Sequence, residues 1–461
     1  MYKKIINLLF ILNFLYSGEV GHHIDFPLFS IIPFIGILLS IALIPLINHH
    51  FWESHYGKVS LFWALLFYLP LLIFNRSFAL EELILVVFTE YFPFIILLLA
   101  LFTIAGGIQL KGTLVGTPKL NTILILLGTV LASWMGTTGA AMLLIRPLIR
   151  ANKHRSSNVH IIIFFILLVA NIGGSLSPLG DPPLFLGFLQ GVDFFWTTIN
   201  LFIPMLIHII FLITVFFFLD TYFYSKETKK QNSNEPQVPI QIEGKWNFLL
   251  ILGVIFSVLM SGTYDFGSIH IFNVELKNQN ILRDIILLIL TFLSLKLTDD
   301  KLRKSNGFTW FPILEVAKLF AGIFITIIPA ISMLKLGLDG PLYKIIELTT
   351  YVDGTQNPFM YFWLTGILSG FLDNAPTYLV FFNTAGGDAQ MLMNSLPKTL
   401  LAISSGSVFF GAITYIGNAP NFMVRSIAEE NGIKMPSFFG YMGWSLIILI
   451  PIFSIYSVLF F

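Results

Sequence analysis

Two aspartates lie in stretches of the chain that are otherwise apolar, and their side chains offer the clearest chemistry. Asp181 precedes Pro182 and Pro183, and Asp373 follows an apolar run. An ionisable side chain inside a membrane segment costs about 2.5–3.5 kcal/mol on insertion scales, so its presence indicates a function. Each aspartate could also cap a helix that starts just after it, and both roles can hold together. Because carboxylate oxygens bind hard cations as well as protons, we predict that both acids bind sodium or protons.

Uncharged oxygen donors surround the two acids. Asn374 follows Asp373, and Asn418 and Asn421 flank an Ala-Pro pair. Carboxamide and hydroxyl oxygens suit a hard cation, although a single Ser or Thr in a membrane helix more often bonds a neighbouring carbonyl. With the two acids, the predicted cation- and proton-binding residues are Thr137, Thr138, Ser175, Ser177, Asp181, Asp373, Asn374, Thr377, Asn418 and Asn421.

The elements that must hold these residues are two broken membrane segments, at 170–183 and 411–421. Each begins as an apolar helix and is then interrupted by glycine, proline and polar residues. A broken backbone in hydrocarbon leaves N–H and C=O groups unpaired, so it persists only where protein buries it or where it lines a wet cavity. Paired breaks in corresponding places of two halves are typical of the binding site of a transporter.

The composition indicates a membrane protein. The 461 residues are 56% hydrophobic and 11% charged, and the mean hydropathy is +0.84, whereas ordinary soluble domains carry about 25% charged residues. We therefore predict an all-α polytopic protein whose first partner is the lipid bilayer. A net charge of +1 argues against nucleic acid as a partner, and the absence of Cys excludes disulfides and thiolate metal sites. The sequence has no nucleophile–base set that would indicate an enzyme, and we expect no bound cofactor.

Membrane helices need about 20 apolar residues each. Residues 1–25 contain a short basic start and an apolar run, which is typical either of a signal peptide or of a first transmembrane segment. The other predicted spans are 26–48, 59–75, 84–105, 160–190 (broken), 197–219, 246–262, 281–297, 319–335, 397–422 (broken) and 436–460.

Two further apolar stretches, 120–150 and 357–387, are each interrupted by a polar tip. Because Lys and Arg concentrate in short cytoplasmic loops, the basic residues at both ends of 120–150 place both ends on the cytoplasmic side. That stretch should therefore enter the membrane, turn at 136–139 and return as a re-entrant helical hairpin. The second stretch, with its tip at 372–377, falls on the opposite side and should form a hairpin that enters from outside.

One offset lays the first half of the chain over the second. Adding 237 carries Gly180 onto Gly417 and Asp181 onto Asn418, and it superposes the two hairpins without a gap. Because the hairpins enter from opposite faces, we predict two inverted repeats, each with a re-entrant helical hairpin and a broken transmembrane helix. The predicted divisions are residues 1–25, a first repeat at 26–223, a cytoplasmic linker at 224–245 and a second repeat at 246–461.

Three motifs carry a resemblance to the ion transporter superfamily, and within it to the NhaD-type sodium/proton antiporters and the related citrate transporters. They are Ser-Pro-Leu-Gly-Asp-Pro-Pro at 177–183, Phe-Leu-Asp-Asn-Ala-Pro-Thr at 371–377 and Gly-Asn-Ala-Pro-Asn at 417–421. The resemblance extends from about residue 30 to the end. It implies a scaffold domain, a mobile transport domain that moves like an elevator, and a homodimer.

Carboxylate transporters of this superfamily carry Ser-Asn-Thr at both hairpin tips, and here the chain departs from them. Its tips read Gly-Thr-Thr and Asp-Asn-Ala-Pro-Thr, and the second places an acid where an anionic substrate would bind. We therefore predict a sodium/proton antiporter that works by alternating access in a bacterial inner membrane, with Na⁺ and H⁺ as the transported ions. The alternative is cation- or proton-coupled transport of a small carboxylate such as citrate, with helix N-termini facing the anion.

Overall fold

Helices form nearly all of the computed structural model, which describes residues 25–227, 238–271 and 273–461. The predicted first segment at 1–25 lies outside the described residues except for Asp25, and so do residues 228–237 of the predicted linker. By length and composition, eight helices in the described part could cross a membrane, or nine if one bent pair counts as a single span. The chain is thus an all-α polytopic membrane protein.

A first group of helices precedes the hairpin predicted at 120–150. They are η1 (Leu28–Ile31), α2 (Ile32–Ile47), α3 (His49–Phe74), α4 (Arg76–Leu85), the π-helical turn η2 (Val86–Tyr91) and α5 (Phe92–Ala105). Two of them start earlier than predicted because the side chains of Asn48 and Asn75 accept hydrogen bonds from backbone N–H groups three residues on, and so cap α3 and α4. Such caps stabilise the polar first turns of a helix, which the apolar pattern alone does not reveal.

A corresponding group of helices follows the linker. They are α11 (Trp246–Thr263), α12 (Asn278–Leu297), α13 (Asp300–Ser305), α14 (Phe311–Thr326), α15 (Ile328–Lys335), η4 (Gly337–Asp339) and α16 (Tyr343–Leu348). Helices α14 and α15 form the bent pair, with an angle of 41°. Helix α12, predicted as a span at 281–297, carries Arg283 and Asp284 and is not among the eight apolar helices.

Two helix pairs occupy the stretches predicted as hairpins, and each pair turns at a single residue. Gly136 alone separates α6 (Pro118–Met135) from α7 (Thr137–Ala151), and Asp373 alone separates α17 (Pro358–Leu372) from α18 (Asn374–Thr384). Both have positive φ, +81° and +86°. Asp373 is the only residue other than glycine with positive φ in the described part of the chain. Its carboxylate accepts a hydrogen bond from Ala375 N at 3.1 Å, a local bond that helps aspartate adopt this conformation.

Each predicted break contains a short 3-10 turn, and a few non-helical residues join that turn to the next helix. In the first half, α8 (Val159–Leu168) leads to η3 (Ile172–Leu176) and then to α9 (Pro182–Leu189). In the second half, α20 (Pro397–Phe410) leads to η5 (Gly411–Ile413) and then to α21 (Ala419–Glu430). Proline stands in the first turn of both α9 and α21, where its missing N–H removes no helical bond.

Two pairs of corresponding helices, the ones that follow the turns and the breaks, start 237 residues apart. This separation holds for the starts of α7 and α18 and for the starts of α9 and α21. Each half then ends in a long helix, α10 (Phe194–Ser225) or α22 (Phe438–Phe460), and the short α19 (Ala389–Asn394) follows α18. The residues before α9 and α21, Asp181 and Asn418, both have extended backbone.

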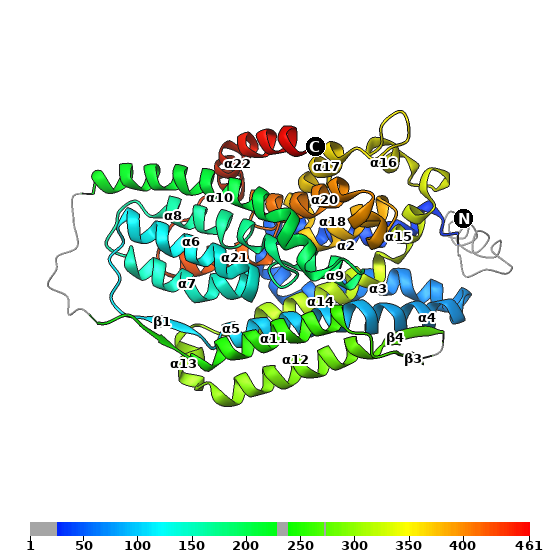
Figure 1. Cartoon of the computed structure of the whole chain (residues 1–461), viewed down its shortest axis with the longest axis horizontal. Helices are drawn as coiled ribbons and strands as arrows, with labels where there is room; N and C mark the ends of the chain where they lie inside the picture. Colours follow the sequence, from blue (N-terminus) through cyan, green and yellow to red (C-terminus); the bar gives the residue numbers. More distant parts are fainter. Residues whose placement is uncertain (1–24, 228–237, 272) are drawn as a thin grey trace.

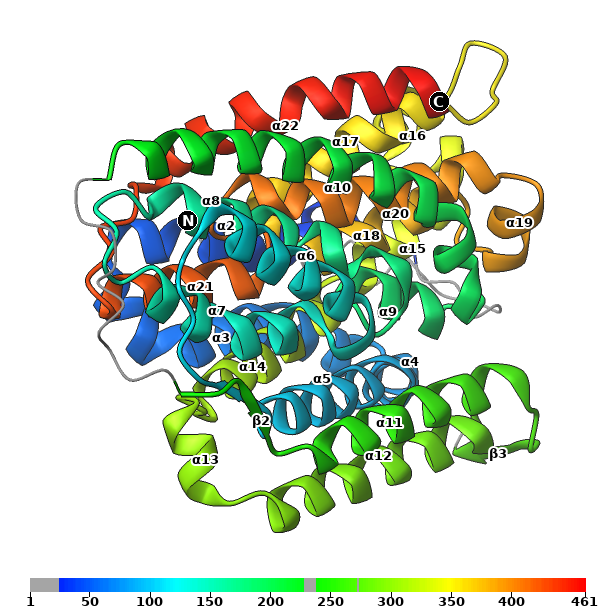
Figure 2. The same cartoon turned by 60° about the vertical axis from the view of Figure 1, so that its left-hand side comes forward.

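The broken segments and helix pairs lie between two outer groups of helices. Figures 1 and 2 show α10 and α22 along one side of the molecule, and α5, α11 and α12 packed together along the other. Two small antiparallel sheets lie at the ends: β1 (Gln109–Lys111) with β2 (Gln241–Glu243), and β3 (Ser268–Ile271) with β4 (Val274–Lys277). The first sheet ties the described end of the linker to the residues that precede α6, with an ion pair of 2.7 Å between Lys111 and Glu243.

Two glycine pairs let the backbone cross itself within the breaks. A Cβ added to Gly180 would lie 2.1 Å from the carbonyl oxygen of Gly174, and one added to Gly417 would lie 2.6 Å from that of Gly411. A backbone atom cannot move aside as the end of a side chain can. The breaks therefore require glycine at these crossings.

We expect Gly180→Ala to lower the melting temperature and the yield of folded protein, because overpacking costs about 1–3 kcal/mol even where side chains can adjust. The measurement is thermal unfolding in detergent, followed by size-exclusion chromatography. Gly443→Ala is the matched control, since an added Cβ there meets nothing within 4 Å. Equal melting temperatures for the two variants would contradict the close crossing.

Candidate functional site

Asp181 is the centre of a buried polar cluster. Its side chain is 1% exposed, and it accepts three hydrogen bonds from side chains of three different segments. Thr137 Oγ1 donates at 3.1 Å, Asn374 Nδ2 at 2.5 Å and Asn418 Nδ2 at 2.8 Å. Among the described residues, no Lys or Arg forms an ion pair with this carboxylate. The structure thus brings together four of the ten predicted site residues.

These donors come from both halves of the chain. Thr137 is the first residue of α7, Asn374 is the first residue of α18, and Asn418 immediately precedes α21. Asp181 itself immediately precedes α9. The bond between Asp181 and Asn418 joins two residues that are 237 positions apart, so the corresponding positions of the two halves meet at the centre of the cluster.

Asn421 and the unpredicted Asn171 extend the cluster on one side. Asn171 Nδ2 donates to Asn421 Oδ1 at 2.7 Å, and both residues are fully buried. Asn418 also donates to the carbonyl oxygen of Ala170 at 3.1 Å. Asn171 is an amide within an apolar run, which the sequence does show. Its partner lies 250 residues away, so sequence spacing could not reveal the contact.

The other predicted site residues bond the backbone or stand at the tips. The hydroxyls of Ser175, Ser177 and Thr377 donate to the carbonyl oxygens of Ile172, Ser133 and Asp373. Thr138 follows Thr137 and is half-buried. Asp373 is also half-buried, and one of its carboxylate oxygens accepts a hydrogen bond from the backbone N–H of Ala375 in the same turn. The second carboxylate therefore lies at the tip of a helix pair, next to the residue that contacts the first.

Four helix N-termini converge on Asp181. They belong to helices α7, α9, α18 and α21, which contain 15, 8, 11 and 12 residues. Helices α7 and α18 start at residues that bond Asp181, α21 starts directly after Asn418, which also bonds it, and α9 starts directly after Asp181 itself. A helix N-terminus carries an effective charge of about +0.5 and unpaired N–H groups. The arrangement therefore stabilises negative charge, whether on Asp181 or on a bound anion.

One acceptor in the cluster has no donor. Asn374 Oδ1 is buried and makes no hydrogen bond with any described residue, although Nδ2 of the same amide donates to Asp181. Buried polar atoms in native proteins are nearly always paired, so an orphan requires a reason. Next to a carboxylate, this oxygen is suited to a cation or to a protonated group. The described residues contain no group of three His, Asp or Glu side chains that could hold a metal ion.

Two other ionisable groups in predicted spans lie outside this cluster. Glu90, in the π-helical turn η2, accepts a hydrogen bond from Gln190 at the end of α9 at 3.1 Å. His208 in α10 is fully buried against the rings of Phe409 and Tyr456. Neither is a direct partner of Asp181.

A second buried network, which the sequence analysis missed, ties the base of the first helix pair to α10. Asp220 is fully buried, and its carboxylate lies 2.6 Å from Arg155 and 2.8 Å from His160. Asn121 of α6 donates to the same carboxylate at 2.9 Å and exchanges hydrogen bonds with Asn152 after α7. This network fixes α6, and hence the position of Thr137 at the far end of the pair.

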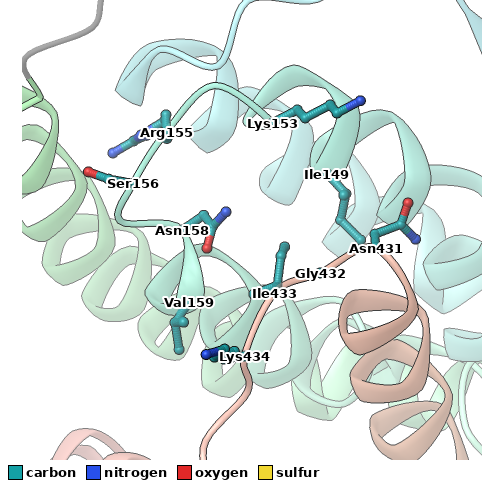
Figure 3. Close-up of a pocket in the computed structure, with 10 residues that line it drawn as sticks. All are labelled: Ile149, Lys153, Arg155, Ser156, Asn158, Val159, Asn431, Gly432, Ile433 and Lys434. Atoms are coloured by element: carbon teal, nitrogen blue, oxygen red, sulfur yellow. The ribbon is translucent and has the colours of Figure 1, made fainter.

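The cavity in Figure 3 is separate from the cluster around Asp181. It measures about 390 Å³ and lies between the segment that follows α7 and the segment that follows α21. Its lining contains Lys153, Arg155 and Lys434 but none of the predicted site residues. Arg155 is already paired with Asp220, and the lining does not reach Asp181. We therefore assign the cavity no role in binding at the cluster around Asp181.

Comparison with known families gives a match that covers nearly the whole chain. A family model described as "Putative citrate transport" matches residues 23–461. No curated protein matches the chain.

We expect Asp181→Asn to loosen both helix-pair tips. An asparagine offers one carbonyl oxygen with two lone pairs, so it cannot accept three bonds, and a buried donor left unpaired costs about 1–3 kcal/mol. The chain has no natural Cys, so a single Thr138→Cys reports the first tip. Maleimide should label this cysteine faster in the Asp181→Asn background than in the parent.

The control for this comparison is Gly443→Cys, on α22 and away from the cluster, which should be labelled equally in both backgrounds. Unchanged labelling at position 138 would show that Asp181 does not hold the tip.

Proposed function

The chain belongs to the family described as "Putative citrate transport", and we propose that it carries a small carboxylate such as citrate, coupled to protons or sodium. As a member of a transporter family with many apolar helices, it is an integral membrane transporter and not an enzyme. The first prediction from the sequence was sodium/proton exchange, and the alternative was coupled transport of a small carboxylate. The family match favours the alternative.

The convergence of four helix N-termini on one buried point is the observation that carries the proposal. A site for a cation alone gains nothing from four positive helix ends, whereas a carboxylate substrate gains from the partial positive charge of each of them. The two breaks, 170–183 and 411–421, contain no Arg that could pair with an anionic substrate, but helix N-termini can take its place.

Coupling follows from the charge of Asp181. An ionised Asp181 and a carboxylate substrate at one buried point repel each other strongly, because Coulomb interactions are stronger in a medium of low effective dielectric constant. A proton on Asp181, or a cation beside it, removes this repulsion. The unpaired Oδ1 of Asn374 lies where it could bind such a cation.

Asp373 is proposed as a second coupling group. It stands at the tip of its helix pair with a backbone conformation that glycine adopts at no cost, and Gly136 has that conformation at the other tip. A residue held in such a conformation costs of order 1–3 kcal/mol and often marks a functional site. The carboxylate side chain is therefore retained at the expense of stability.

We also propose that the two halves are inverted repeats and that the two helix pairs are re-entrant hairpins. The equal separation of two pairs of helix starts, α7 and α18 and then α9 and α21, and the contact between Asp181 and Asn418 support this arrangement. Inversion places the two hairpin tips on opposite sides of a central site, which alternating access requires. The homodimer and the bacterial inner membrane stay predictions.

Purified protein in liposomes tests the proposal. Labelled citrate should accumulate inside when an inward proton or sodium gradient is imposed, and should only equilibrate without a gradient. The competing function is tested in the same vesicles without citrate. Proton movement on addition of NaCl alone, with no citrate uptake under any gradient, would instead establish sodium/proton exchange.

Substitution of the two acids tests their roles. We expect Asp181→Asn and Asp373→Asn each to lower gradient-driven citrate uptake by about tenfold or more, since each removes a group that acts directly in transport. Asp388→Asn is the matched control, because Asp388 also caps a helix, α19, but is exposed on the surface. Uptake at the wild-type rate in either site variant would remove that acid from the mechanism.

A further inference from the structure

Glu90 is an acid within a predicted membrane span, and the proposed function does not yet use it. It lies in η2, a six-residue π-helical turn that joins α4 to α5 within one long apolar helix. A π-helical turn inside an α-helix is uncommon and frequently occurs at functional sites. An ionisable side chain inside the membrane also indicates a function. The backbone and the side chain of this segment thus mark Glu90 independently.

The hydrogen-bond partner of Glu90 is a neutral amide at the end of α9. Gln190 Nε2 donates to Glu90 Oε1 at 3.1 Å. In the described part of the chain, no Lys, Arg or His forms an ion pair with Glu90. The half-buried carboxyl group therefore has no paired cation that would stabilise its ionised form.

The helices around η2 supply charges of both signs. This turn packs against α4, α5, α9 and α14, and α5 and α9 contain no charged residue. Glu82 of α4 and Lys335 of α15 act on Glu90 electrostatically, in opposite directions. The two charged residues of α14, Glu315 and Lys318, instead contact aromatic side chains of α3. The charge of one nearby base is thus opposed by that of one nearby acid.

The end of α9 is closed by the backbone, and this closure fixes the position of Gln190. Gly191 follows with a φ of +101°, and the N–H groups of Gly191 and Val192 donate to the carbonyl oxygens of Phe188 and Gly187 at 3.0 Å. Such a closure with glycine commonly ends a helix. Gly191 is exposed. The amide that bonds the acid therefore lies one residue from the exposed surface.

The second half of the chain has no acid at the equivalent place. The positions 237 residues after Glu90 and Gln190 are Ile327 and Ile427, and both are buried. Ile327 lies between α14 and α15, where the helix bends by 41°. An irregular segment therefore occurs in both halves, whereas the acid occurs only in the first. Packing at this place does not require a carboxyl group.

We propose that Glu90 is a further proton-binding site, which retains its proton while α9 lies against η2 and releases it when α9 moves away. The inference rests on the proposed function, in which a proton is a coupling ion. Against η2, the carboxyl group is partly shielded from water and lies beside the C-terminal end of α9, which is partially negative. Both features disfavour its ionised form. When α9 moves away, water reaches the carboxyl group, its O–H bond breaks and the proton passes to a water molecule.

Helix α9 connects this proton site to the cluster around Asp181. Asp181 immediately precedes the helix, and Gln190 immediately follows it. The helix has eight residues, which span about 12 Å. A movement of the first turn of so short a helix also moves its end. Proton release at Glu90 therefore accompanies movement of the substrate site, as coupled transport requires.

The variant Glu90→Gln tests this site, because an amide has nearly the shape of a protonated carboxyl group but cannot release a proton. We expect citrate uptake driven by a pH gradient to fall by about tenfold, whereas exchange of internal for external citrate, which needs no net proton movement, should stay near the wild-type rate. Glu81→Gln is the matched control, since Glu81 accepts a hydrogen bond from Asn273 and not from α9. Gradient-driven uptake equal to that of the control would overturn the proposal.

Carbodiimide labelling of the wild-type protein tests Glu90 without citrate. Dicyclohexylcarbodiimide is apolar and reacts with protonated carboxyl groups, and at about pH 6 an ordinary Glu, with a pKa of about 4.3, is ionised. Peptide mass spectrometry should therefore find Glu90 labelled and Glu81 unlabelled at that pH. An unlabelled Glu90 would overturn the proton site even if citrate is transported. A labelled Glu90 in a protein that neither exchanges nor accumulates citrate would defeat the proposed function and support the proton site.

Discussion

The fold depends on pairing the backbone groups that are freed where two helices break inside an apolar interior. Hydrocarbon offers these groups no partner, so the protein must supply one for each. Asn421 Nδ2 donates to the carbonyl oxygens of Gly411 and Thr414, and Asn418 donates to that of Ala170. The backbone N–H of Thr137 donates to the carbonyl oxygen of Gly180. Amides of the second half thus pair carbonyl oxygens of both breaks.

The same constraint explains why the centre of the molecule is polar and crowded. The side chains that bond the freed backbone groups of the breaks must lie close to those groups. They therefore also lie close to Asp181, which immediately precedes α9. The hairpin tips add Thr137 and Asn374 because each tip ends against a break. Positive helix ends are gathered there for the same reason, since a break followed by a helix exposes the N-terminus of that helix. The electrostatic character of the site is therefore a consequence of the architecture.

Local patterns predicted the elements, and long-range packing decided the contacts. Glycine, proline and polar runs located both breaks and both single-residue turns, and the helices that follow them, α7 and α18 and then α9 and α21, start 237 residues apart as the offset indicated. Sequence spacing could not show that Asn171 bonds Asn421, or that Asp220 pairs with Arg155 and His160, because each pair joins separate helices or loops. Nor could it show that Asn374 Oδ1 stays unpaired, since that depends on how the segments around Asp181 finally pack.

The two halves differ where their corresponding residues touch, and charge gives a reason. Asp181 and Asn418 occupy equivalent positions and lie 2.8 Å apart. Two ionised carboxylates at that separation would repel by ~6 kcal/mol at an effective dielectric constant of about 20, so a symmetric pair of acids would hold a proton or a cation permanently. With an amide at position 418, Asp181 can gain and lose a proton or a bound cation. The second acid stands instead at Asp373, one residue before the tip residue that contacts Asp181, so each half contributes one acid without direct contact between them.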